Sequence, residues 1–426
     1  MDRRSFLLAT ATLPLLAGCA GRGSDGTVRF EGWDYEAQLV QRNIDRFTRL
    51  TPDVPVSYTP ITSAQFIQKI TAEFLGGGGP DVLYMYDDSL AGSVDAEYLQ
   101  PLDDIAGIDA IYNAIYPSNA AAMTYQGKRW GLPYYTDMQA LVYNAEILAK
   151  AGISAPPTSL DELEQQALRI KRAGVLQYPL GVPAQLADTA ALWLWALVFA
   201  NGSDLFDQDL QPHMSPLTGV FEWVQRVSRQ SKVLDPACVQ LLPVPMDNAV
   251  MAGRYAFVLA PRYSLRTYND PAKSKAAGKI KMAQVPSLDG HSQGTVSSTR
   301  MYCLNGTTQV RDKAIRLLKY LGGFDSTGLP YTAKYWFIQR GLGFPFHSLT
   351  TDPDVLTVLG KFADSTVYAQ LAQVARARIG TSAPWYPQFE QAMQRATQQV
   401  VIGSTTPAAA TASLDATARS LARSFA

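Results

Sequence analysis

The chain alternates short apolar runs with amphipathic segments over most of its length. Residues 28–30 have apolar side chains at alternate positions and lead into Gly32, and residues 180–182 form a short apolar run, both of which are typical of strands. Residues 64–75 carry apolar side chains at helical spacing, which predicts a helix that ends at glycines 76–79. The other predicted elements are strands at 81–86, 255–259, 280–285 and 301–304, and helices at 159–174, 312–321, 388–401 and 413–424, with a linker at 405–411 before the last helix. Strands that alternate with helices predict an α/β fold class.

Two of these segments carry a more specific signal. Residues 81–86 form a continuous apolar run, which predicts a strand buried on both faces in a parallel sheet. Ser159 followed by Glu162 is a capping box, which predicts that a helix begins there and ends near Gly174.

The N-terminus has the pattern of an export signal. Arg3 and Arg4 precede a short apolar run, so residues 1–18 are predicted to be a signal peptide that resembles the twin-arginine type. Residues 16–19 resemble a bacterial lipobox, in which Cys19 is lipidated, and residues 19–26 then form a flexible tether. No later run is apolar enough to span a bilayer. We therefore expect a soluble domain in the cell envelope, exported and anchored to a membrane through its lipid.

Composition limits the function classes. About 408 residues remain after the signal (426 minus 18), which is too many for one ordinary core and suits two lobes. The 37 basic and 37 acidic residues balance without a basic block, so nucleic acid is not an expected partner. Aromatic residues make up 10% of the chain and charged residues only 17%, which favours a folded domain with aromatic-lined surfaces.

Cysteine and histidine are too sparse for a metal centre. Cys238 and Cys303 are the only cysteines after Cys19, and we expect two buried thiols and not a disulfide. The three histidines lie far from either cysteine, so a zinc site lacks its usual ligands. No metal and no cofactor are therefore expected.

Several segments together resemble the extracellular solute-binding proteins of ABC importers, specifically the large group that serves sugars. Residues 79–86 match the group's G-x-x-P-D-V step into a strand, and residues 127–134 match its G-K-x-Y-G-x-P segment. Residues 156–163 match P-P-x-T-W-x-E-L, except that Leu160 replaces the tryptophan. Further matches lie at residues 140–144, 200–207 and 251–257. Each match is weak alone, but they occur in the family's order over most of the mature chain.

The resemblance implies a two-lobe periplasmic-binding-protein-like fold, with a multi-stranded hinge and a ligand cleft between the lobes. Residues 27–136 with 298–325 would form the N-terminal lobe, and residues 137–297 with 326–426 the C-terminal lobe. The implied partners are a small sugar, oligosaccharide or polyol and the ABC permease subunits that receive it, with the binder acting as a monomer. No catalysis is expected.

Aromatic and acidic side chains directly after predicted strands are the first candidates for binding. Trp33 and Tyr35 follow the first strand, and Tyr86 and Asp87 end the buried one. Sugars present C–H faces that stack on aromatic rings and hydroxyls that need planar hydrogen-bond partners. The alternatives are that Trp33 packs against a neighbouring helix and that an aspartate here caps the following helix.

A second group of candidates belongs to the implied crossovers and the second lobe. Tyr135 and Asp137 lie at the first crossover, where side chains of both lobes would meet. Leu192, Trp195 and Phe199 have the spacing of a core stripe, so Trp195 is predicted to be interior and Trp193, off the stripe, to bind ligand. The remaining candidates are Arg262 and Tyr263 after a second-lobe strand, Trp336 and Arg340 after the last crossover, and Gln65 and Asn201. For Arg262 the alternative is a surface ion pair, whereas a ligand role for Arg262 and Arg340 would leave an anionic sugar possible.

Two other function classes remain open. An exported carbohydrate-active enzyme would need two carboxylates at a fixed separation, and no hydrolase motif is present. A ferric or other metal-binding receptor of the same fold is suggested by the adjacent Tyr134 and Tyr135, although the chain contains 21 tyrosines.

Overall fold

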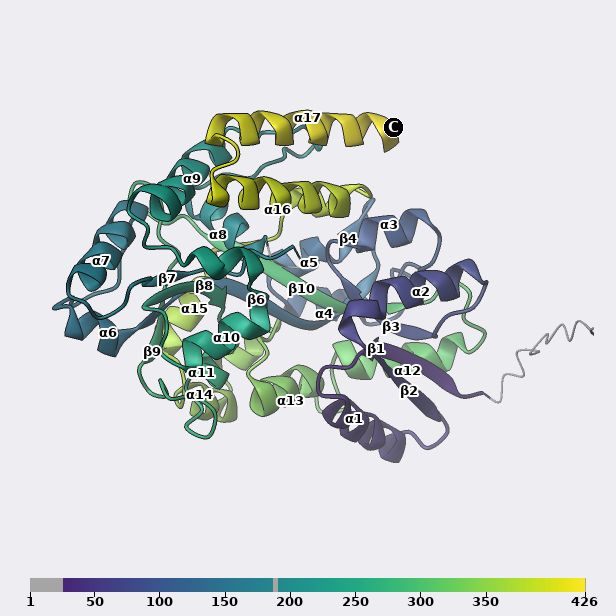
Figure 1. The fold of residues 1–426 in the computed structure, drawn as a ribbon. Coiled ribbons are helices and arrows are strands. Elements are labelled where there is room, and N and C mark those ends of the chain that lie inside the picture. The colour runs from purple at the N-terminus through teal and green to yellow at the C-terminus, as the bar shows by residue number, and fades with distance from the viewer. Residues whose placement is uncertain (1–25, 187–190, 426) are drawn as a thin grey trace, which may run out of the picture.

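The computed structural model describes residues 26–186 and 191–425, so the predicted signal peptide and Cys19 lie outside the described residues. Figure 1 shows the elements that follow. The strands are β1 (Val28–Trp33), β2 (Val56–Ile61), β3 (Val82–Tyr86), β4 (Thr124–Tyr125), β5 (Lys128–Arg129), β6 (Gly131–Asn144), β7 (Leu180–Gly181), β8 (Phe257–Pro261), β9 (Ile280–Ala283), β10 (Thr295–Leu304) and β11 (Ala375–Arg376).

Helices account for most of the remaining chain. Short 3₁₀ turns lie at Ser63–Gln65, Pro236–Gln240, His347–Thr351 and Ile379–Ser382, and a π-helical turn at Arg226–Gln230. The α-helices are α1 (Ala37–Leu50), α2 (Phe66–Leu75), α3 (Leu90–Asp95), α4 (Ile108–Ala114), α5 (Pro117–Ala122), α6 (Ala145–Lys150), α7 (Leu160–Arg172), α8 (Leu192–Ala200), α9 (Pro216–Gln225), α10 (Pro243–Met251), α11 (Ser264–Tyr268), α12 (Arg311–Gly322), α13 (Tyr331–Arg340), α14 (Pro353–Leu359), α15 (Ser365–Val374), α16 (Tyr386–Ile402) and α17 (Pro407–Phe425).

A mixed sheet runs through both halves of the molecule in the order β2-β1-β3-β10-β6-β8-β7. β1 pairs in parallel with β2 and β3, whereas β10 pairs antiparallel with both β3 and β6. The prediction that β3 is buried holds, but one of its two neighbours is antiparallel. The carboxyl ends of β1 and β3 therefore point toward the middle of the molecule, where the two halves meet.

β6 and β10 are the strands that join the two halves. β6 pairs with β10 up to Met138 and with β8 from Gln139 onward, so one continuous strand belongs first to one sheet region and then to the other. In Figure 1 the helices α1, α2, α3 and α12 surround the first region, and α6–α11 and α14–α17 the second, with α13 between them. The molecule is thus a two-lobe α/β protein, as predicted.

Most predicted elements are present with shifted ends. Ser159 Oγ accepts a hydrogen bond from Glu162 N at 3.0 Å, which confirms the predicted helix start. β10 begins at Thr295, six residues before the predicted start, because a run of threonine and serine in a buried strand is not recognisably apolar. The predicted linker at 405–411 is wrong in most of its length, since α17 begins at Pro407 and packs against α16. The proline occupies the first turn of a helix, where a missing N–H is tolerated.

Cys238 and Cys303 are buried and unpaired, which confirms the expected thiols. Within residues 26–186 and 191–425, no helix has both the length and the hydropathy needed to cross a bilayer.

Candidate functional site

A cavity of about 240 Å³ lies where the two halves of the molecule meet. Aromatic side chains and a few polar groups line it. Its lining residues are Trp33, Tyr35, Ser63, Tyr86, Tyr135, Asp137, Gln139, Leu192, Pro261, Tyr263, Val296, Ser298, Arg300 and Leu342. Six of these were predicted from the sequence as ligand contacts: Trp33, Tyr35, Tyr86, Tyr135, Asp137 and Tyr263. We call this space the aromatic cavity.

Strand ends and strand alternation place these side chains. Trp33 and Tyr86 end β1 and β3, which are parallel neighbours, so their rings stack with centroids 4.8 Å apart. Tyr135, Asp137 and Gln139 alternate along β6 and share one face, because successive side chains of a strand point to opposite faces. Val296, Ser298 and Arg300 do the same on β10.

Asp137 holds the hinge strand to the second lobe. Its Oδ1 accepts hydrogen bonds from Met138 N and Arg262 Nε at 2.8 and 3.2 Å, and its Oδ2 accepts one from Tyr263 N at 3.1 Å. Burial raises the pKa of Asp137 to about 6, although the Arg262 guanidinium opposes the shift. The carboxylate is at the cavity wall, but its hydrogen bonds join β6 to the segment after β8.

Arg262 is buried behind this wall and does not line the aromatic cavity. Its side chain is 0% exposed, its Nη1 donates to Tyr368 O at 2.9 Å, and its guanidinium lies 3.8 Å from the Tyr368 ring centre. The sequence-based alternative of a surface ion pair is wrong for this arginine, because the pair it forms is interior.

Arg300 is the cation of the aromatic cavity. Its Nη1 donates to Asp87 Oδ1 at 3.0 Å, and its guanidinium lies over the Tyr86 ring at 4.5 Å. Asp87 itself does not line this cavity; it is 3% exposed and also accepts a hydrogen bond from Arg378 Nη2 at 3.2 Å. The structure thus places Asp87 in a buried ionic network beside the cavity, where the sequence suggested a ligand contact or a cap.

The network extends to α16. Arg378 Nη1 donates to Glu390 Oε1 at 3.2 Å and to Tyr386 Oη at 3.1 Å. Burial raises the pKa of Glu390 to about 7, against the opposing charge of Arg378. Burial therefore favours the neutral form of Glu390 relative to an exposed glutamate.

The shifted pKa of Glu390 predicts a pH-dependent stability. A carboxyl group whose pKa is raised from 4.5 to about 7 contributes stability that is fully present below pH 4.5 and is lost as pH rises through 7. We expect the Glu390→Gln variant to lose this part of the pH dependence. Thermal unfolding of both proteins between pH 5 and pH 8 measures the difference, and parallel curves would contradict the assignment. Comparing the two curves cancels the contributions of Asp137 and Asp247, whose pKa values are raised in the same direction.

The other predicted site residues lie outside the aromatic cavity. Asn201 follows α8, where its side chain donates to Leu197 O at 2.7 Å and accepts from Leu288 N at 2.8 Å. Gln65 is exposed and accepts from Thr62 Oγ1 at 3.0 Å, two residues after Ser63 of the cavity. Arg340 was predicted as a ligand contact, but its Nη2 donates to Glu36 Oε2 at 2.7 Å in an ion pair outside the cavity.

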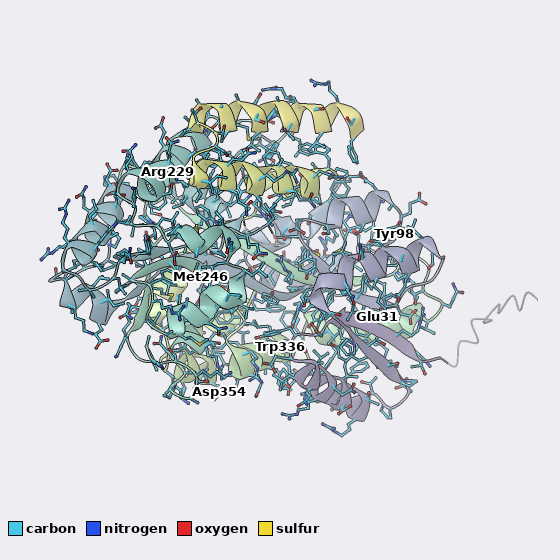
Figure 2. The ribbon with its side chains drawn as sticks, viewed as in Figure 1. Glu31, Tyr98, Arg229, Met246, Trp336 and Asp354 are labelled. Atoms are coloured by element: carbon cyan, nitrogen blue, oxygen red, sulfur yellow. The ribbon has the colours of Figure 1, made fainter. Side chains whose placement is uncertain are left out.

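Two predicted tryptophans are interior. Trp336, which Figure 2 labels on α13 between the two lobes, is 1% exposed and packs edge-on against Tyr134 at 5.4 Å. Trp193 is 3% exposed and its Nε1 donates to Pro183 O at 3.1 Å. The sequence placed Trp195 in the interior and Trp193 at the ligand site. Their burial does not show this difference, because every residue of α8 is buried.

The residues that sequence reasoning missed come mainly from the hinge strands. Gln139, Ser298 and Arg300 face the cavity because of the register between β6 and β10, in which Ser298 lies opposite Asp137. Their only sequence signal is polar residues at alternate positions of a strand. That signal requires knowing that residues 295–300 are a strand.

A second cavity of about 580 Å³, which we call the rear cavity, lies on the other side of the hinge strands. Asn119 of α5 donates to Thr299 Oγ1 at 2.9 Å, so α5 covers the face of β10 opposite Ser298 and Arg300. Ser118 of α5, Asp87, Arg376 and Arg378 line the rear cavity, which contains residues of both halves of the chain. Asp87 and Arg378 therefore separate the two cavities.

Comparison with known families relates part of the chain to one class of proteins. Residues 33–240 match the model of the bacterial extracellular solute-binding proteins. This part of the chain is similar to that family. Among known proteins, the chain is similar to a putative binding protein of Brucella abortus, at 21% identity over 323 residues, or 75% of this chain and 76% of the relative.

Solved structures show the same solute-binding fold. Maltose-bound T. maritima MalE3 matches with a TM-score of 0.80 at 18% identity, over 93% of this chain and 99% of that one. The GacH receptor of Streptomyces glaucescens, solved unliganded and with acarbose, matches with a TM-score of 0.79 at 21% identity, over 94% and 99%. Other solute-binding proteins of this fold were solved with α-D-tagatose, ribitol or D-mannitol.

Proposed function

We propose that this chain is the solute-binding component of an ABC importer and that the aromatic cavity holds a neutral sugar or polyol. The observation that carries the proposal is the cavity itself, in which the rings of Trp33, Tyr35, Tyr86, Tyr135 and Tyr263 come together between two lobes. Such rings stack on the C–H faces of a sugar ring, while polar groups between them satisfy its hydroxyls. The sugars and polyols bound in the solved structures named above support the same class of solute.

A neutral solute is favoured over an anionic one by the charges at the wall. Among the described lining residues the cation is Arg300, and it is already paired with Asp87. Arg262 and Arg340, from which the sequence left an anionic sugar open, are paired with Asp137 and Glu36 away from the cavity. A phosphate or carboxylate would therefore lose its hydration without finding an unpaired cation among the described lining residues, which costs free energy.

The mechanism that we propose is closure of the lobes without covalent chemistry. We divide the chain into an N-terminal lobe of residues 27–136 with 298–325 and a C-terminal lobe of 137–297 with 326–426. The change of β6 partner between Met138 and Gln139 supports a hinge in this region. Solute contacts from both lobes would favour the closed state, which then docks on the permease. A lipid on Cys19 would keep the binder near that permease.

The alternative classes have less support. Tyr134, whose adjacency to Tyr135 suggested a metal receptor, stacks on Tyr84 at 4.6 Å inside the aromatic core. Within the part of the chain that the structure describes, no cluster of three or more His, Cys, Asp or Glu has the arrangement of a metal site. An enzyme would turn over a glycoside, which the first experiment below detects.

A panel of solutes tests the proposal. We expect at least one of maltose, α-D-tagatose, ribitol and D-mannitol to bind with one site per chain by calorimetry and to raise the unfolding temperature. Glucose 6-phosphate serves as the anionic comparison and is expected to bind more weakly than glucose. Absence of binding across the panel, or hydrolysis of maltose, would contradict the proposed function.

A variant of the cavity ties any binding to this site. Tyr35 is 40% exposed, so Tyr35→Ala removes one ring of the cavity with little loss of core packing. We expect affinity to fall about ten- to hundredfold, as for a central aromatic contact. Tyr178→Ala, a partly exposed tyrosine outside the cavity, is the matched control and should leave affinity unchanged.

A further inference from the structure

Arg300, the cation of the aromatic cavity, is held by charged residues that do not line this cavity. Arg300 reaches Asp87 through Nη1 at 3.0 Å, and the same Nη1 donates to Thr299 O at 3.1 Å. Above the guanidinium lies the ring of Tyr86, which in turn stacks on Trp33. The position of Arg300 therefore affects two of the rings that line the aromatic cavity.

Asp87 is shared between two arginines. Its Oδ1 accepts from Arg300 Nη1 and from Arg378 Nη2, while its Oδ2 accepts from Thr299 N at 3.0 Å. Arg378 follows β11 in the segment that leads to α16, and it lines the rear cavity and not the aromatic one. The two arginines thus meet at one carboxylate from opposite sides of the hinge.

Arg378 is itself fixed by residues of α16. Its Nη1 donates to Tyr386 Oη and Glu390 Oε1, and its side chain is only 1% exposed. Its Nε has no hydrogen-bond partner in the described structure, so the two Nη atoms account for its orientation. The planar fork holds Asp87 through Nη2 and Glu390 through Nη1, whereas a lysine would replace these two separate donors with a single ammonium nitrogen.

Burial makes this arrangement stiff. Asp87, Arg300 and Arg378 have side chains that are 3%, 5% and 1% exposed. Moving one member would leave another charge unpaired in a medium of low dielectric constant, which is costly. Displacement of Arg378 should therefore be transmitted through Asp87 to Arg300.

We propose that Arg378 is a positioning residue for solute binding: it fixes Asp87, which fixes Arg300 and, through it, the aromatic wall of the cavity. The expected effect on affinity rests on the proposed function. The coupling from Arg378 through Asp87 to Arg300, which we call the relay, can be tested without it. The cavity is complete only when the segment carrying Arg378 is docked in the network. A residue outside the cavity then controls its affinity.

The relay is tested without any solute by NMR of the full-length protein labelled with [¹⁵N]arginine. The Nε–Hε signal of Arg300 is assigned by its loss in Arg300→Lys. We expect Arg378→Lys to shift that signal and to speed its exchange with water about tenfold or more. Arg376→Lys is the matched control, because Arg376 lies two residues away but donates instead to Phe199 O and Ser203 O. It should leave the Arg300 signal in place.

A milder variant keeps the test decisive if Arg378→Lys does not fold. Tyr386→Phe removes one acceptor of Arg378 and preserves the packing of a fully buried ring. It should shift the Arg300 signal in the same direction by a smaller amount. An Arg300 signal that is unchanged in every folded variant would overturn the relay.

Affinity tests the consequence for binding. Each member of the panel of maltose, α-D-tagatose, ribitol and D-mannitol that binds the wild type should bind Arg378→Lys about tenfold more weakly and Arg376→Lys equally well. Unchanged affinity alongside a shifted Arg300 signal would overturn the positioning role. If no member binds the wild type, the proposed function fails, while the NMR result still decides the relay.

Discussion

Replacing Arg262 with glutamine is expected to lower the free energy of unfolding by about 3–5 kcal/mol. The substitution leaves the carboxylate of Asp137 buried without its cation, and removing one partner of a buried ion pair has a cost of this size. It also removes the hydrogen bond to Tyr368 O, so that β6 loses its link to α15. Urea denaturation followed by circular dichroism gives the value.

The surface pair of Arg340 provides the control. Arg340 and Glu36 are 38% and 31% exposed at their side chains, so Arg340→Gln is expected to cost at most about 1 kcal/mol. Adding Asp137→Asn to Arg262→Gln removes the unpaired charge and should recover part of the lost stability. If the Arg262 and Arg340 substitutions lower the free energy of unfolding equally, the interior pair contributes no more to stability than the surface pair.

The second large effect is expected at Trp193. Because this side chain is 3% exposed and donates to Pro183 O, Trp193→Ala should lower the free energy of unfolding by about 3–5 kcal/mol, as large core truncations do. Trp195→Ala in the same helix should cost a similar amount, since Trp195 is fully buried. Chemical denaturation of the two variants gives the comparison.

A conservative replacement separates packing from binding. Trp193→Phe retains most of the ring and should recover much of the stability lost in Trp193→Ala. If Trp193→Ala leaves stability within about 1 kcal/mol of the wild type, the side chain does not act as core. Its predicted role in solute binding would then be the better explanation for a tryptophan at this position.

The two tryptophans also show how far periodicity predicts a fold. A 3.6-residue pattern identifies one buried face, but α8 is surrounded on all sides, and a run that is apolar throughout has no distinguishable face. The strands could be predicted because their apolar runs are bounded by glycine, proline and polar residues. The predicted strand is shorter than β10 because Thr295, Ser297, Thr299 and Arg300 are buried by their position in the sheet and not by their own hydrophobicity.

The same difference separates the site residues that the sequence could predict from those that it could not. Trp33, Tyr35 and Tyr86 could be placed at the cavity because they directly follow strands, and neighbouring parallel strands end together. Ser298 and Arg300 could not, because only the register between β6 and β10 determines which side of the strand they occupy. The arginines were the hardest, because their partners are distant in the chain: Arg262 pairs with a residue 125 positions away and Arg340 with one 304 positions away.

The stacked pair of Trp33 and Tyr86 has a practical consequence. Trp33 lies at the wall of the aromatic cavity, whereas Trp195, Trp223 and Trp336 are among the most deeply buried side chains. Indole emission depends on the polarity around the ring, so a sugar bound in the cavity as we propose would alter the fluorescence of Trp33, while the interior tryptophans provide a constant background. The proposed site would then carry its own optical reporter of occupancy, and its titrations would need no attached dye.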